Sequence, residues 1–482
     1  MSKENNPTRF DMSPDEFKQF GHKLIDWIAN YMENVENYPV LSQIEPGEIK
    51  KQLPQSPPAQ GESFDDIFGD IEKIILPGIT HWNHPKFMAY FNSTSSGPGI
   101  LGELLSAALN VNGMIWQTSP AATELEQVVL DWLRQMLNLP EKFWGIIYDT
   151  ASISTLHAIA AAKTLTEEKL KDKFDLSRLS IYFSEHAHSS VEKAIRFIEI
   201  KNIRKIPVDE NFKMIPQKLN EAIENDISEG LIPFCVIATV GTTSTTSIDP
   251  VKEIVKICKD KNLWLHVDAA YGGTAAIVPE MRNVLEGCES ADSFVVNPHK
   301  WMFTPIDLSA FYITEPRLLK KTFSLVHEYL KTEKDSEVVN LMDYGIQLGR
   351  RFRALKLWFV IRYFGKEGII KILREHIRIS RKFAGFIEAH PDFEKMAPNP
   401  FSLVCFRAKI NGITETGKIN KLNEKLMKKV NKTGKAYLSH TKLNGNYVLR
   451  LAVSGIHTNE KDMLDTWELI QKTLTEIKKE MY

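Results

Sequence analysis

The sequence Val295-Val296-Asn297-Pro298-His299-Lys300-Trp301 places a lysine directly after an apolar run and a proline. Residues 293–296 predict a short buried strand, and Pro298 ends it because proline has no N–H to donate to a strand ladder. Lys300 is therefore expected at a strand end, where α/β sheets hold their functional groups. A lysine there can have its pKa lowered by its surroundings and can form a Schiff base. A single lysine on a loop is more often simply solvated, so the residues upstream decide between the two interpretations.

The stretch upstream, His266-Val267-Asp268-Ala269-Ala270-Tyr271-Gly272-Gly273, ends another predicted strand at residues 263–267. Asp268 then lies at a strand's carboxyl end, where its ordinary role would be a turn or a helix cap. The functional alternative is a carboxylate that keeps a pyridine nitrogen protonated, so that the ring draws electrons. A carboxylate beside a cation stays ionised even in a dry site. Asp268 and Lys300 would thus supply the two contacts that pyridoxal phosphate (PLP) requires.

These two stretches resemble the group II PLP-dependent decarboxylases, most closely the aromatic-L-amino-acid decarboxylases. Five further segments resemble the family and occur in the family's order: HWNHPKFMAYF (81–91), SPAATELE (119–126), EHAHSS (185–190), ATVGTTSTTSID (238–249) and LGRRFRALKLWFV (348–360). The resemblance implies a fold-type-I PLP-dependent transferase-like fold. It also implies an N-terminal helical dimerisation segment (1–96), a large PLP-binding α/β domain (97–355) and a small C-terminal α+β domain (356–482).

The pattern of the chain agrees with that α/β fold class. Strand-like runs at 234–239, 263–267 and 293–296 alternate with helix-like runs, which predicts βαβ units and a mostly parallel sheet. Beyond about residue 356 the pattern becomes α+β, with Asn444-Gly445 as a hairpin turn. No internal repeat interrupts this order.

The resemblance implies roles for four residues. Lys300 would carry PLP as a covalent Schiff base, Asp268 would pair with the ring nitrogen, and His188 would stack on the ring and help to transfer protons. Tyr329 matches the tyrosine credited with protonating the carbon left after carbon dioxide departs, and a phenol is a suitable acid for that step. The expected cofactor contacts are Thr150, Ala151, Ser152, His188, Thr243, Asp268, Ala270, Asn297, His299 and Lys300.

Two of the expected contact regions, near Thr150 and near His188, lie at the predicted starts of helices. Residues 145–152 predict a strand that enters a turn before an alanine-rich helix, and the N–H groups at such a helix start suit a phosphate. The family usually has glycines where this chain has Tyr148-Asp149, so we expect Asp149 to point away from a phosphate. After His188, residues 189–192 (SSVE) predict a capping box.

An aromatic-rich stretch near residue 90 is typical of a core, but the resemblance makes it part of a substrate pocket. Asn112 and Met114 match positions that the family presents from the opposite subunit, and Gly349 leaves room for a ring. Arg350 can bear on a substrate carboxylate or on structure, and the sequence does not separate the two. The expected pocket is Trp82, Tyr90, Phe91, Ser93, Asn112, Met114 and Gly349.

The composition excludes several classes of partner. The 482 residues are 43% hydrophobic and 25% charged, with a formal net charge of −1 and no long block of like charge. We therefore expect no nucleic-acid or membrane partner. The polar N-terminus and the cysteine spacing predict a cytoplasmic protein with reduced thiols and no metal site. The cysteines are Cys235, Cys258, Cys288 and Cys405.

The function that the resemblance implies is a lyase reaction: decarboxylation of an L-amino acid to its amine and carbon dioxide, with an aromatic substrate expected (tryptophan, tyrosine, dihydroxyphenylalanine or phenylalanine). An apolar stripe on the first helix suggests a clamp that joins a homodimer with active sites at the interface. A decarboxylase of a non-aromatic amino acid, an aldehyde synthase and an aminotransferase are alternatives, and a non-enzymatic PLP-binding scaffold is the weakest. The presence of both His188 and Tyr329 argues against oxidation, since family members that oxidise the substrate tend to lose one of them.

Overall fold

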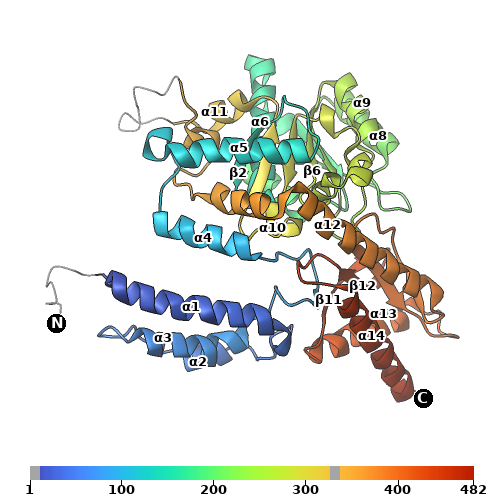
Figure 1. The fold of residues 1–482 in the computed structure, drawn as a ribbon. Coiled ribbons are helices and arrows are strands. Elements are labelled where there is room, and N and C mark those ends of the chain that lie inside the picture. The colour runs from blue at the N-terminus through green and yellow to red at the C-terminus, as the bar shows by residue number, and fades with distance from the viewer. Residues whose placement is uncertain (1–10, 326–336, 482) are drawn as a thin grey trace.

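The computed structural model describes residues 11–325 and 337–481. Figure 1 shows a large α/β unit above two smaller parts, an N-terminal helical layer and a C-terminal α+β unit. Among the described residues, no helix is long and apolar enough to cross a membrane. The four cysteines are free and buried.

The large unit is built on a seven-stranded sheet with the order β2-β8-β7-β6-β5-β3-β4. The strands from β7 to β4 run parallel, and β8 runs antiparallel to both of its neighbours. The predicted, mostly parallel sheet is therefore confirmed, with one reversed strand. The strands are β2 (Trp144–Tyr148), β3 (Leu179–Ser184), β4 (Asn202–Ile206), β5 (Ile232–Thr239), β6 (Trp264–Asp268), β7 (Ser293–Val296) and β8 (Ser309–Ile313).

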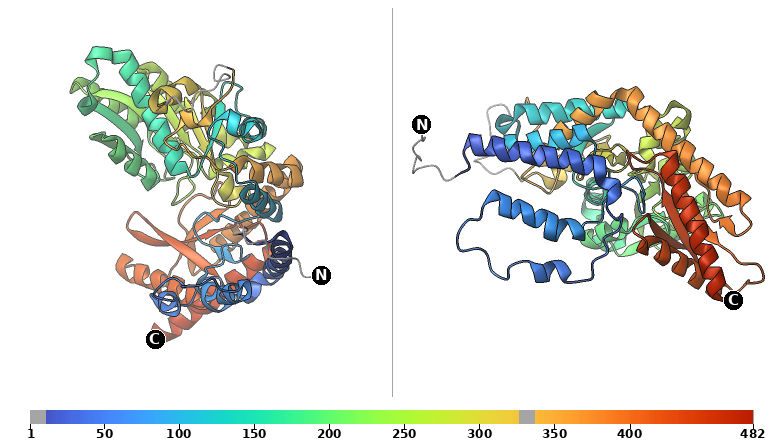
Figure 2. Two further views of the ribbon diagram at one scale, coloured as in Figure 1. Left: turned by 90° about the vertical axis from the view of Figure 1, so that its left-hand side faces the viewer. Right: turned by 60° about the horizontal axis from the view of Figure 1, so that its bottom comes forward.

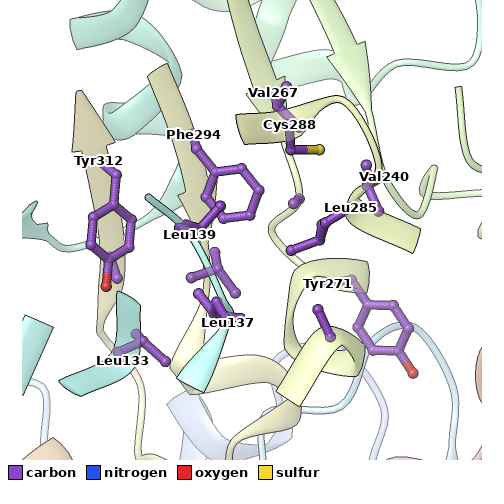
Figure 3. Close-up of a cluster of buried hydrophobic side chains, with 14 of the residues drawn as sticks. Leu133, Leu137, Leu139, Val240, Val267, Tyr271, Leu285, Cys288, Phe294 and Tyr312 are labelled. Carbon is purple, nitrogen blue, oxygen red and sulfur yellow. The ribbon is translucent and has the colours of Figure 1, made fainter. Parts of the chain in front are cut away.

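Helices cover the sheet and enclose the core. Figure 3 shows side chains of neighbouring strands, Val267, Phe294 and Tyr312, in one cluster with leucines from the segment after α5. Four strands are buried along their whole length, as expected for a sheet covered on both faces. The helices of this unit are α4 (Gly97–Leu109), α5 (Pro120–Met136), α6 (Ala151–Leu170), α7 (Ser189–Ile198), α8 (Pro216–Ser228), α9 (Val251–Lys261), α10 (Pro298–Trp301) and α11 (Pro316–Phe323).

The C-terminal unit contains a five-stranded sheet with the order β1-β11-β12-β10-β9. The predicted hairpin turn is present between β11 and β12, with Asn444 and Gly445 both at positive φ (49° and 79°). β1 comes from far upstream and pairs parallel with β11. The elements are β1 (Phe87–Met88), β9 (Phe393–Lys395), β10 (Leu403–Ala408), β11 (Tyr437–Leu443), β12 (Asn446–Ala452), α13 (Thr416–Lys432) and α14 (Glu460–Met481).

One long helix, α12 (Arg353–Ala389), joins the two units. Its first part packs against α4 and α5, and its last part packs against β9 and β10. Gly365, at φ +63°, kinks the helix between these parts. The boundary expected at residues 355 and 356 thus lies inside α12.

The N-terminal layer contains α1 (Pro14–Asn34), α2 (Glu48–Gln52) and α3 (Phe64–Asp70). α1 begins with a capping box between Ser13 and Glu16, as its sequence indicates. Figure 2 shows α1 beside α3, and the rings of Phe20 and Phe64 stack there with centroids 4.4 Å apart. No residue of α1 is buried, so its apolar side chains do not end in a core of the described chain.

Candidate active site

Lys300 and Asp268 lie at the carboxyl ends of adjacent strands. β6 and β7 run parallel, with Asp268 opposite Val295, and Lys300 follows in the short helix α10. The Asp268 carboxylate is buried and accepts a hydrogen bond from the Ala270 N–H (3.0 Å). Burial lowers the pKa of Lys300, and the Asp268 carboxylate opposes that shift. The carboxylate therefore favours the charged form of the amine, against the effect of burial.

His188 is the third group at this place. It is the N-cap of α7, and its Nδ1 accepts a hydrogen bond from the Ser190 N–H (3.2 Å). The capping box predicted over residues 189–192 is therefore wrong, because the helix already begins at Ser189 and the imidazole takes the role of the cap. Burial lowers the pKa of His188; Asp268 opposes the shift and Lys300 adds to it. The imidazole is thus held neutral near neutral pH.

Hydrogen bonds fix the turn that carries Lys300. Asn297 accepts from the Ser309 hydroxyl (2.7 Å) at Oδ1, and its backbone N–H donates to the Ala270 carbonyl (3.1 Å). The Leu308 N–H donates to Nδ1 of His299 (2.9 Å), and burial lowers the pKa of this histidine to about 3. Asn297, His299 and Ala270 are expected cofactor contacts, and the structure places all three in the frame around Lys300.

The start of α6 offers a place for a phosphate. Thr150 is the N-cap and makes no side-chain cap hydrogen bond to the helix. Its N–H and hydroxyl instead donate to Oδ1 of Asp149 (2.5 and 3.2 Å). Within the described chain, nothing accepts from the N–H groups of Ala151 and Ser152. Free N–H donors at the positive end of a 20-residue helix suit a phosphate, as the sequence predicts.

Arg450, on β12, is a residue that sequence reasoning did not single out. Its buried guanidinium donates to the carbonyls of Thr243 (2.8 Å) and Ser244 (3.0 Å) and to the Ser439 hydroxyl (2.9 Å). It thereby fixes the loop of Thr243, an expected cofactor contact whose own side chain is exposed. A charged residue among the apolar residues of a predicted strand was the available signal.

Phe91 links Lys300 to an aromatic stack. Its ring lies face to face with Tyr271 (centroids 3.9 Å apart), which in turn stacks on Trp301 (5.0 Å). The Lys300 Nζ lies 5.5 Å from the centroid of the Phe91 ring. The Lys300 amine therefore lies near one aromatic ring, which is itself the end of a three-ring stack.

Tyr90 and Trp82 lie in a different group from Phe91. Tyr90 has a positive φ of 54°, and its hydroxyl is 2.9 Å from that of Tyr437 on β11. The ring of Trp82 is 6.0 Å from that of Tyr90, and both side chains are exposed. Ser93 is partly buried and has no hydrogen bond within the described chain.

Asn112, Met114 and Gly349 form a third group, which we call the pocket wall. Asn112 accepts from the Arg350 N–H (2.9 Å), and its Nδ2 lies 3.6 Å from the Met114 sulfur. A Cβ on Gly349 would meet only the Asn112 amide, at 3.8 Å. In residues 11–325 and 337–481, no hydrogen bond or ring contact joins this wall to Lys300 or Phe91. Tyr329 lies outside the described residues.

The structure separates the two roles that the sequence left open for Arg350. Its buried guanidinium donates to Glu126 (2.6 Å) and to the carbonyl of Ile147 (3.0 Å). Glu126 also accepts from the Ile147 N–H (2.8 Å). Arg350 therefore holds the segment before α12 against β2, and its charge is neutralised by a carboxylate of its own chain.

Residues 46–409 match the sequence model of the pyridoxal-dependent decarboxylase conserved domain. The chain belongs to this family. This decarboxylase uses PLP as its cofactor, and the donor set fits it: an amine, a carboxylate and an imidazole at one sheet edge, with free N–H groups at a helix start. The individual residue roles remain predictions.

The relatives of this decarboxylase match along almost their whole length. Tryptophan decarboxylase 2 from Oryza sativa subsp. japonica is 41% identical over 478 residues, 97% of this chain and 96% of that protein. A phenylacetaldehyde synthase from Arabidopsis thaliana is 41% identical over 473 residues, 96% of each protein. The crystal structure of Oryza sativa TDC with PLP and tryptamine gives a TM-score of 0.94 at 37% identity and covers 98% of this chain and 100% of that one. The fold is thus the fold-type-I PLP-dependent transferase-like fold.

Proposed function

We propose that this decarboxylase converts an aromatic L-amino acid (tryptophan, tyrosine, dihydroxyphenylalanine or phenylalanine) to the corresponding amine and carbon dioxide. The observation that carries the proposal is the stack of Phe91 on Tyr271, which places a flat apolar ring 5.5 Å from the Lys300 amine. Aromatic side chains prefer such surfaces. The names of the tryptophan decarboxylase and the phenylacetaldehyde synthase also point to indole and phenyl rings.

The residues of the site divide the work. When bound, PLP supplies the electron sink for the bond that breaks. The Lys300 amine would hold the cofactor, and the Asp268 carboxylate would keep the proton on the ring nitrogen. His188 would pack against the cofactor, and Tyr329 would return a proton to the substrate's α-carbon with help from the neutral His188 imidazole. The orientation of the substrate carboxylate decides which bond breaks.

We propose that the enzyme works as a homodimer whose interface includes α1 and α4. The two helices border a groove of about 450 Å³ lined by Phe17, Ile25 and Leu104, among others. Phe17 is 63% exposed and Leu104 is 46% exposed, which is unusual for large apolar side chains that face one another. In this dimer the exposed pocket wall completes the partner's site, which accounts for its separation from Lys300 in one chain.

We also propose a cytoplasmic location, which the state of the cysteines supports. All four thiols are free and buried. Burial raises the pKa of each thiol, so each stays protonated and inert. A fluorescent fusion that enriches in a membrane or secreted fraction would count against this location.

The test of the reaction is a screen of the purified protein with PLP against the twenty amino acids and dihydroxyphenylalanine. Release of carbon dioxide with one equivalent of amine is expected for at least one aromatic substrate. Release of carbon dioxide only from non-aromatic amino acids would overturn the substrate class.

An aldehyde synthase is the second candidate, because one relative at 41% identity carries that name. The same screen separates the two, since an aldehyde synthase would consume molecular oxygen and water and would form the aldehyde, ammonia and hydrogen peroxide in place of the amine. The sequence keeps both His188 and Tyr329, and for that reason we favour amine formation.

A further inference from the structure

Three consecutive residues at the end of β2 hold the segment that contains Gly349. The Ile147 carbonyl accepts from Arg350 (3.0 Å), and the Tyr148 hydroxyl donates to the Tyr344 carbonyl. The third is Asp149, whose Oδ2 accepts from the Gln347 side-chain amide (3.3 Å). Hydrogen bonds from the end of β2 therefore hold the segment that contributes Gly349 to the pocket wall.

Asp149 differs from its two neighbours because it also belongs to the predicted phosphate turn. Its other oxygen, Oδ1, accepts from both the N–H and the hydroxyl of Thr150. One carboxylate thus connects the start of α6 to Gln347, two residues before Gly349. The sequence led us to expect Asp149 to point away from the phosphate, but it gave no partner for the carboxylate.

The segment around Gln347 is otherwise held loosely on its outer side. Ile346 is 55% exposed and Leu348 is 49% exposed, so neither side chain anchors it. The Ile346 N–H donates to Nε2 of His157 on α6 (3.1 Å). With both apolar neighbours in solvent, the backbone just before Gly349 is held by the Ile346 bond to His157 and by the bond from the Gln347 side chain to Asp149.

We propose that Asp149 and Gln347 are a positioning pair that sets the pocket wall relative to the phosphate turn. The pair touches neither the reacting atoms nor the amine of Lys300. It deepens the proposed function, because the wall it positions is the one that would contact the substrate ring in the dimer. The negative charge of Asp149 is a separate effect: it lies beside the phosphate turn, so it weakens phosphate binding by like-charge repulsion.

The central experiment compares kcat and KM for L-tryptophan in the PLP-loaded full-length enzyme. Gln347→Ala removes the link but leaves Asp149 on Thr150, so KM should rise about tenfold, the equivalent of one charge-assisted hydrogen bond, with kcat little changed. Asp149→Ala should raise KM similarly, and the double variant should be no worse than the poorer single variant. Gln135→Ala, which breaks a surface amide–carboxylate bond to Asp131 (2.6 Å), is the matched control and should leave KM unchanged.

Asp149→Asn separates the link from the charge. The Asn oxygen can still accept from Thr150, and its amide can donate to the Gln347 oxygen, so KM should stay within about twofold of wild type. Removal of the charge should tighten PLP binding, measured by fluorescence titration of the cofactor-free protein. If Asp149→Asn instead raises KM as much as Asp149→Ala does, the hydrogen-bonded link is not the cause and the proposal fails.

Amide hydrogen exchange of the PLP-loaded enzyme gives a readout that needs no substrate. Exchange of residues 345–349 should speed up in Gln347→Ala and Asp149→Ala, and stay as in wild type in Asp149→Asn. Unchanged exchange in both alanine variants, or KM effects that multiply in the double variant, would overturn the positioning pair. Wild-type enzyme that fails to act on any aromatic amino acid would overturn the proposed function, whereas the exchange result would still decide this proposal.

Discussion

At the scale of single residues, the site depends on a lysine whose surroundings disfavour its charge. Burial lowers the pKa of Lys300, and the only nearby group that opposes the shift in the described chain is the Asp268 carboxylate. A neutral amine is the form that attacks a carbonyl carbon. The structure thus places an amine with a lowered pKa and a carboxylate at one sheet edge, as the predicted roles require.

Lys300→Ala should abolish turnover, with a loss of at least about a thousandfold, because it removes the amine proposed to bind the cofactor covalently. Borohydride should fix PLP to the wild-type protein but not to this variant, as read by mass spectrometry. Lys252→Ala, at an exposed ion pair with Glu286, is the control and should behave as wild type. Turnover at the wild-type rate would remove Lys300 from the mechanism.

A pH profile tests the pairing of the two charges. Asp268 raises the pKa of Lys300, so Asp268→Asn should lower that pKa further below its ordinary value of 10.5. Re-attachment of PLP to the cofactor-free protein needs the neutral amine, so its rate should rise with pH through a lower midpoint than in wild type. Stopped-flow absorbance across the neutral and alkaline range gives the midpoint independently of the total amount bound. A midpoint that stays in place or moves upward would contradict the pairing.

Much of the geometry at this scale could be predicted from the sequence, because parallel neighbouring strands bring their carboxyl ends to one edge. That rule places Asp268 beside Lys300. It does not predict that His188 is a helix cap, since the exact first residue of a helix depends on packing. It also does not predict that the N–H and hydroxyl of Thr150 donate to Asp149. The catalytic and binding roles of these residues stay predictions.

At the scale of elements, the C-terminal unit reaches into the site through β12. Arg450 ties this strand to the loop of Thr243 and Ser244, and its guanidinium also lies 5.5 Å from the Phe91 ring. The three partners come from segments far apart in the chain, so no periodicity or spacing could have paired them. The alternation of strand residues predicts β12, but it does not predict which groups Arg450 contacts.

Arg450→Leu should destabilise the protein and loosen the loop. The Thr243 carbonyl would lose its donor and the Ser244 carbonyl would keep only the Cys405 thiol (3.3 Å), at a cost of about 2 kcal/mol in the free energy of unfolding. Thermal unfolding and PLP titration should both show the loss, and Arg450→Lys should fall between wild type and the leucine variant. Arg374→Leu removes an exposed pair with Glu280 and should cost less than about 1 kcal/mol. Equal effects of the two leucine variants would remove Arg450 from this role.

At the scale of the whole molecule, the apolar faces of α1 and α4 need a covering surface. We expect wild-type protein to have the mass of two 55.0 kDa chains by light scattering. Leu104→Glu puts a charge in the groove beside α1 and should shift the protein toward single chains, with a parallel loss of activity. Ile227→Glu, at a similarly exposed position on α8, is the control and should leave the mass unchanged. A wild-type protein that is a single chain while fully active would contradict the dimer.

The overall architecture followed from the sequence more readily than its connections did. The alternation of strands and helices predicts the mostly parallel sheet, and Asn444-Gly445 predicts the hairpin. Tertiary contacts decide three other features: the reversed direction of β8, the kink of α12 at Gly365 and the pairing of β1 with β11. Each depends on which distant segment offers a partner, and short-range patterns carry no such information.

The pairing of β1 with β11 has a consequence for how the protein is made. Phe87 and Met88 pair with Tyr437 and Leu438, which lie far downstream in the chain. During translation, the stretch that leads to Phe91 emerges from the ribosome long before those partners exist. The strand pairing on the aromatic side of the site can therefore form only after β11 has been synthesised.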